Sequence, residues 1–125
     1  DRAALSASAD DSALPAHKRL LSAVLLSSLE YRANADYSFS LLRIGECRVL
    51  FLPGEPFVEY QLLAQSLIPD EFLAVAANCS DNFLYLPQPC HFAEGGYEPT
   101  SFCWCTEQFA SRFKHAVTEL LGVSD

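Results

Sequence analysis

The chain has 125 residues, half of them hydrophobic and 12% aromatic, which is enough to bury a core as one domain. Sixteen acidic and eight basic residues give a formal net charge of −8, which argues against binding to nucleic acid or electrostatic docking on an anionic membrane. No apolar run reaches the ~20 residues that span a bilayer, so we expect a soluble protein without a transmembrane segment. The chain begins with Asp1 and contains no methionine, so we interpret it as a fragment or a processed chain of unknown localisation.

The N-terminal third is predicted to contain one helix. Residues 1–14 are rich in alanine, serine and aspartate without clear periodicity, and we expect a linker or a frayed end there. Pro15 suits the first position of a helix. Apolar residues then recur at helical spacing and predict an amphipathic helix over about 15–33, which residues 34–36 end.

The middle of the chain predicts a β-hairpin. Tyr37, Phe39 and Leu41 alternate with their neighbours as in a half-buried strand. Gly45-Glu46 suits a two-residue type II′ connection. Residues 47–52 are almost continuously apolar, as expected for a strand that is covered on both faces.

The second half predicts a βαβ unit and a closing helix. Strand 47–52, a helix over 55–67 and a strand over 72–77 form the unit, which should cross over with a right hand. Residues 78–104 read as a long loop, a length that is usually functional. A helix over 106–121 would end at a glycine cap, Gly122. The fold class is therefore α/β, with a mixed sheet, flanking helices and a single unit over 15–125.

One carboxylate and one loop are the candidates for chemistry. Glu55 follows a Pro-Gly turn after a buried strand, at the sheet edge where open α/β sheets build their sites. The ordinary alternative is an acidic residue that stabilises a helix N-terminus. Tyr85 lies among apolar neighbours, where packing is the usual role of a tyrosine. The run Glu94–Glu98 contains two glycines that let the backbone approach a ligand, or that form a mobile turn.

The cysteines leave several possibilities open. Their number is five, so they cannot all pair within the chain. Cys47 and Cys79 read most simply as small core residues. Cys90, His91, Cys103 and Cys105 could form a zinc knot, but the Cys-x-Cys spacing is narrower than that of usual structural zinc sites. A disulfide or free thiols are the preferred interpretation.

An ordered set of motifs resembles the C-terminal part of the neutral/alkaline (non-lysosomal) ceramidase family, above all its bacterial ceramidase-like members. The motifs are Leu42–Gly45, Leu52–Phe57, Tyr85–Pro87 and Glu94–Glu98, and the likeness covers about residues 37–122. The resemblance implies part of a larger α/β hydrolase domain. It also implies a zinc-dependent amidase that cleaves ceramide or a similar lipid amide, with a role in sphingolipid metabolism.

The resemblance also implies a divided zinc site. The family binds zinc through two histidines of its N-terminal part and through a glutamate and a tyrosine of its C-terminal part. Those positions fall on Glu55 and Tyr85 here. Tyr97 is the second choice for the tyrosine, and otherwise lines the pocket together with the glycines Gly54, Gly95 and Gly96.

The paired histidines have no counterpart in this chain, so we expect it to be inactive without a missing N-terminal segment. Family members that are secreted, periplasmic or membrane-associated are all compatible with the resemblance. Two rival hypotheses remain. The chain is a truncated, inactive homologue that serves as a binding or interaction module, or it is a small structural-zinc protein that uses Cys90, His91, Cys103 and Cys105.

Overall fold

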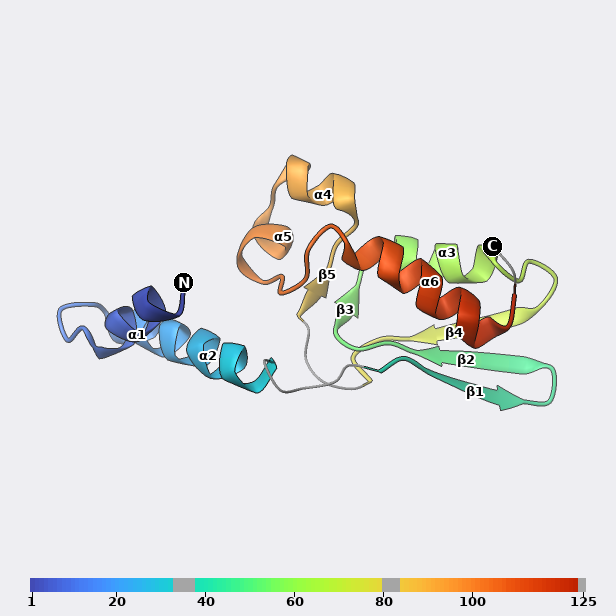
Figure 1. The fold of residues 1–125 in the computed structure, drawn as a ribbon, viewed down its shortest axis with the longest axis horizontal. Coiled ribbons are helices and arrows are strands. Elements are labelled where there is room, and N and C mark those ends of the chain that lie inside the picture. Colours follow the sequence, from blue (N-terminus) through green and yellow to red (C-terminus); the bar gives the residue numbers. More distant parts are fainter. Residues whose placement is uncertain (33–37, 80–83, 124–125) are drawn as a thin grey trace. The chain divides into compact units, whose positions relative to one another are not determined.

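The computed structural model describes residues 1–32, 38–79 and 84–123 (Figure 1). The chain divides into two compact units, Asp1–Asp36 and Tyr37–Asp125, which we describe separately. This division lies at a different place from the predicted boundary between residues 1–14 and 15–125. The helix predicted over 15–33 belongs to the first unit and the α/β elements belong to the second.

The first unit is a pair of helices. Helix α1 spans Arg2–Asp10, where we had predicted a linker or a frayed end, and α2 spans Ala16–Arg32. The Asp1 carboxylate accepts the Ala3 N–H at 3.0 Å and caps α1. The Ser22 hydroxyl meets the Ser8 hydroxyl at 2.9 Å and joins the two helices. Helix α2 confirms the predicted helix, whose end at 34–36 lies outside the described residues.

The second unit is built on a three-stranded mixed sheet in the order β1-β2-β4. Strands β1 (Ser40–Ile44) and β2 (Cys47–Phe51) form the predicted hairpin, and Gly45 turns between them at φ 59°. Strand β4 (Phe72–Ala76) pairs parallel with β2. The fold class is confirmed at this level as mixed α/β. Tyr37, predicted to begin the first strand, lies outside the described residues.

Two helices cover one face of this sheet (Figure 1). Helix α3 (Val58–Ser66) connects β2 to β4 and completes the predicted βαβ unit, and α6 (Phe109–Leu121) packs beside it. The core between the helices and the sheet consists of Leu50, Leu52, Tyr60, Ala64, Ile68, Leu73, Leu86, Phe113, Val117 and Leu121. Gly122 closes α6 at φ 73°, which confirms the predicted glycine cap.

The other face of the sheet carries apolar side chains that stay exposed. The register aligns Ile44, Cys47 and Phe72 across the three strands. Ile44 is 62% exposed and Phe72 is 64% exposed. We had predicted that residues 47–52 are covered on both faces. In the described part of this unit, helices cover one face only, and Cys47 lies on the other. Cys47 and Cys79 are both exposed, so their predicted role as core residues is wrong.

A second, two-stranded parallel sheet joins β3 (Glu55–Pro56) to β5 (Tyr85–Leu86). The predicted helix over 55–67 therefore starts late, at Val58, because the Glu55 N–H donates to the Leu84 carbonyl at 2.8 Å and draws Glu55 into a strand.

The long loop predicted over 78–104 also contains regular structure where it is described. Strand β5 is followed by two short helices, α4 (Pro89–Glu94) and α5 (Tyr97–Ser101). Residues 80–83 lie outside the described part. None of the helices in the described residues is long and apolar enough to span a membrane.

Candidate functional site

The β3–β5 pair brings together two residues that lie far apart in the sequence. Glu55 is the register partner of Tyr85, and Pro56 is the partner of Leu86. The Phe57 N–H donates to the Leu86 carbonyl at 3.1 Å, one step beyond the pair. Register partners on neighbouring strands project to the same face of a sheet. The carboxylate of Glu55 and the phenol of Tyr85 therefore share one face.

A buried turn positions Glu55. Pro53 and Gly54 are both buried, and Gly54 has φ 65°, a conformation that favours glycine. The Gly54 carbonyl accepts the Asn78 N–H at 2.7 Å, which anchors the turn to the chain that follows β4. The chain then emerges, and Glu55 is exposed. The turn fixes the backbone at Glu55, while the Glu55 carboxylate stays accessible to a ligand.

Tyr85 and Tyr97 form a hydrogen-bonded pair. Their hydroxyl oxygens lie 2.6 Å apart, and their rings meet edge to face with centroids 5.6 Å apart. Phe102 supports both residues, because its carbonyl accepts the Tyr85 N–H at 3.0 Å and its ring packs on that of Tyr97. Tyr97 is 52% exposed and Tyr85 is half-buried, so Tyr97 is the more solvent-exposed member of the pair.

These surroundings keep Tyr85 in its neutral form. The hydrogen bond to Tyr97 is the main cause that raises the pKa of Tyr85 to about 12, followed by burial and by the negative charge of Glu55. Glu98 adds a smaller effect of the same sign. Tyr85 therefore carries its proton throughout the neutral range, next to a carboxylate that acts on it electrostatically.

The two loop glycines, Gly95 and Gly96, allow the chain reversal that brings Tyr97 to Tyr85. Gly95 ends α4 at φ 82°, and Gly96 precedes α5 at φ 110°. Both values favour glycine over residues with a side chain. The reversal between the short helices turns the chain back, so that Tyr97 meets β5. The positive φ values explain why glycine occupies positions 54, 95 and 96. That these three glycines line a pocket stays a prediction.

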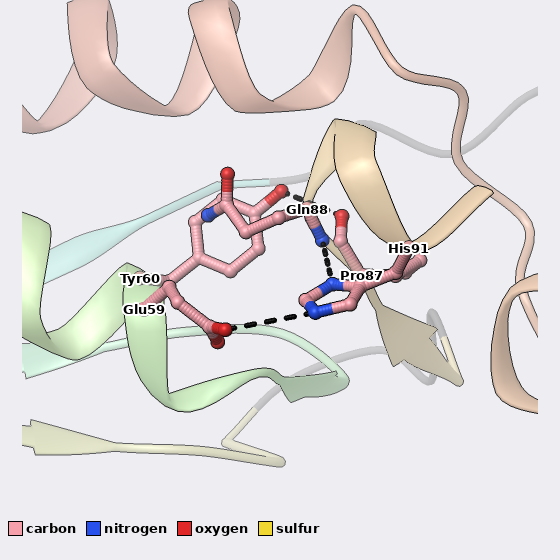
Figure 2. Close-up of polar contacts among 5 residues, drawn as sticks. All are labelled: Glu59, Tyr60, Pro87, Gln88 and His91. Carbon is pink, nitrogen blue, oxygen red and sulfur yellow. Dashed lines mark hydrogen bonds and ion pairs between the residues drawn. The ribbon is translucent and has the colours of Figure 1, made fainter. Parts of the chain in front are cut away.

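A second polar cluster lies beside this site, between α3 and α4 (Figure 2). The Nδ1 atom of His91 accepts the Gln88 N–H at 3.1 Å, and Nε2 faces the Glu59 carboxylate at 3.6 Å. The ring of Phe57 lies 4.6 Å from the imidazole, centroid to centroid. Tyr60 donates its hydroxyl to the Pro87 carbonyl at 2.9 Å. This cluster holds α4 against α3 and uses both ring nitrogens of His91.

Sequence reasoning missed the Glu59–His91 contact. One available signal was Gln88-Pro89, a polar residue followed by proline at a helix start, with His91 at the third helical position where capping side chains lie.

The described residues bring together too few donors for a complete metal site. No three histidine, cysteine, aspartate or glutamate side chains among them form a group that could hold a metal ion. Cys103 and Cys105 lie together, with Sγ atoms 3.4 Å apart, while His91 makes the contacts described above. Glu55 and Tyr85 offer two oxygen donors on one face. A catalytic zinc normally has three protein ligands, so these two residues fit part of a site.

Comparisons of the chain with protein-family models, with curated proteins and with solved structures found no match.

Proposed function

We propose that this chain donates Glu55 and Tyr85 to the zinc centre of an amidohydrolase that resembles the neutral ceramidases. The substrate would be a lipid amide, such as an N-acyl sphingoid base. The observation that supports this most is the register pairing of Glu55 with Tyr85, two residues that were singled out from separate motifs. A second, histidine-bearing segment of the same protein would supply the remaining ligands.

The two donors suit this metal in their chemistry. A glutamate oxygen is a common zinc ligand, and a phenol oxygen is a second oxygen donor on the same face. When bound, zinc would lower the pKa of a water molecule toward ~7 and polarise the amide carbonyl.

The chain's own residues would do the rest of the work. The Glu55 carboxylate would accept a hydrogen bond from the attacking water and orient it. Without the metal, Tyr85 carries its proton on Oη, since the pKa of its hydroxyl is raised to about 12. If Tyr85 donates that proton to Tyr97, the direction that raises the pKa of Tyr85, the hydroxyl proton of Tyr97 is free to stabilise the negative charge that develops on the carbonyl oxygen.

The exposed face of the β1–β2–β4 sheet favours a second candidate, an interaction module without catalytic activity. Leu42, Ile44 and Phe72 on this face are between 44% and 64% exposed, and contiguous apolar surface of this kind marks a protein interface. The proposed zinc hydrolase would also use such a face, because the histidine-bearing segment that it requires would have to pack on this chain. The exposed face alone therefore does not distinguish the two candidates, whereas the zinc content of the protein does.

The test measures zinc content and lipid-amide hydrolysis in the complete protein that its reading frame encodes. Glu55→Ala should lose zinc and lower kcat/KM on the order of 100-fold or more, at least as much as the loss of a residue that supports a metal ligand. Glu59→Ala is the matched control, an exposed glutamate four residues away, and should retain both. If Glu55→Ala retains zinc and activity, Glu55 is not a ligand.

The rivals give different results. An interaction module holds no zinc in any variant, and its binding to a partner is weakened by Ile44→Asp. A structural-zinc protein holds about one zinc in the isolated 125-residue chain, and Cys103→Ser removes it.

A further inference from the structure

Cys103 and Cys105 form a close pair of thiols beside the tyrosines. Their Sγ atoms lie 3.4 Å apart, and both side chains are half-buried. The Cys103 thiol also lies 3.5 Å from the carbonyl oxygen of Cys105. Both cysteines are reduced in this structure. A disulfide has its sulfur atoms about 2.05 Å apart, so a small approach of the two side chains closes the bond.

We propose that Cys103 and Cys105 are a thiol–disulfide exchange site, whose co-reactant is a low-molecular-weight disulfide such as oxidised glutathione. The Cys103 thiolate attacks one sulfur of that disulfide, which breaks its S–S bond and releases one thiolate. The Cys105 thiolate then attacks the Cys103 sulfur, and the second small thiolate leaves. The protein dithiol is oxidised by two electrons, the small disulfide is reduced, and the two protons end on the two released thiols.

The surroundings assign the order of attack. Burial is the main cause that raises the pKa of the Cys105 thiol, and the hydrogen bond with Cys103 adds to it. Cys105 is therefore the poorer first nucleophile, and it acts second, within the mixed disulfide. A ring closed by a single intervening residue, Trp104, is tightly constrained, and constrained disulfides are the readily reduced ones. The site is thus reversible.

The exchange site is directly connected to the tyrosine pair. Cys103 forms backbone bridges to Leu84 and to Tyr85 in β5. Its neighbour Phe102 accepts the Tyr85 N–H and packs on the ring of Tyr97. Closing the ring changes the backbone at Cys103, so it should also change the surroundings of the Tyr85–Tyr97 hydrogen bond. The Tyr85–Tyr97 pair at the proposed functional site would then respond to whether the two thiols are reduced or joined as a disulfide.

Mass analysis of the 125-residue chain tests the exchange itself. The chain is equilibrated without oxygen in buffers of reduced and oxidised glutathione, alkylated, and cleaved after glutamate. The fragment 95–107 contains Cys103 and Cys105 and lacks the other three cysteines. In oxidising buffer it should lose both alkylation sites and two hydrogens, and reducing buffer should restore them. Cys90→Ser should behave in the same way, whereas Cys103→Ser should carry at most one glutathione.

The proposal is overturned if fragment 95–107 stays doubly alkylated while other cysteines react, or if it accumulates glutathione adducts without closing. The connection to the tyrosines is tested by ring-carbon resonances of labelled tyrosine, assigned with Tyr85→Phe and Tyr97→Phe. Oxidation should shift the Tyr85 and Tyr97 signals. Unchanged Tyr85 and Tyr97 signals in the oxidised chain would refute this connection.

Discussion

The three-stranded sheet with α3 and α6 differs from the small β3–β5 pair in where its side chains lie. Beneath the helices the side chains are apolar and almost completely buried, with Leu50, Tyr60 and Val117 each at 0% exposure. The β3–β5 pair instead places an exposed carboxylate next to a phenol. The first region holds the unit together, and the second is attached to it through buried Leu86. Stability and chemistry should therefore respond to different substitutions.

The strongest test of this difference is a truncation in the core. Phe113 is 1% exposed and packs on the rings of Phe39 and Tyr60. Phe113→Ala should lower the free energy of unfolding by about 3–5 kcal/mol, because it leaves a cavity that its neighbours cannot fill. Urea unfolding followed by circular dichroism measures this. Tyr85→Phe is the control in the other region, and an equally large loss there would remove the distinction.

Tyr60 connects the two regions, and its hydroxyl gives the next largest effect. It donates to the Pro87 carbonyl, which follows β5 (Figure 2). Tyr60→Phe keeps the ring but leaves a buried carbonyl without this partner, at a cost of about 1–2 kcal/mol. The same unfolding measurement checks it. A stability equal to that of the unmodified chain would mean that water replaces the hydroxyl at Pro87.

Tyr97→Phe should change the titration of Tyr85 more than it changes the free energy of unfolding. The hydrogen bond with Tyr97 is the main reason that the pKa of Tyr85 is raised to about 12, so removing it should return that pKa toward the ordinary value near 10. A pKa raised by folding stabilises the protein fully below about pH 10, and this contribution is lost as the pH rises toward 12. The tyrosine ring-carbon resonances followed against pH measure the shift. An unchanged titration of Tyr85 would show that burial and the neighbouring carboxylates hold its pKa.

The Glu59–His91 contact should give the smallest effect. Its atoms are 3.6 Å apart, and the Glu59 side chain is 46% exposed, so solvent screens the pair. Glu59→Gln should change the free energy of unfolding by about 0–1 kcal/mol. His91→Ala should cost more, since it also removes the acceptor of the Gln88 N–H and the ring packed on Phe57. Equal losses in both variants would mean that the contact between Glu59 and His91 carries the whole effect.

The sequence predicts the parts of this fold that short-range patterns determine. Alternation around Gly45 and the apolar run that follows predict the hairpin, and helical spacing predicts α2 and α6. Helix α1 was missed because its alanines and serines form no apolar stripe. Glu55 was placed in a helix because nothing near it in sequence shows that its N–H bonds to Leu84, a residue that joins it only through tertiary structure.

The candidate site divides in the same way. The motifs single out Glu55, Tyr85 and Tyr97 separately, whereas their meeting depends on pairing between distant strands and on a reversal at Gly95 and Gly96. The contacts that Phe102 makes with both tyrosines also follow from folding alone. Cys103 directly follows Phe102 in the sequence, but no local pattern shows that this segment lies against the two tyrosines.

The central claim is that Glu55 and Tyr85 are zinc ligands, and X-ray absorption at the zinc edge in the complete protein tests it most directly. The account predicts a first shell of oxygen and nitrogen atoms at about 2.0–2.2 Å, with the signature of two imidazoles and no sulfur. Glu55→Ala should lose the metal, and Glu59→Ala should leave the spectrum unchanged. A first shell that contains sulfur at about 2.3 Å, or a spectrum that is the same in Glu55→Ala, would contradict it.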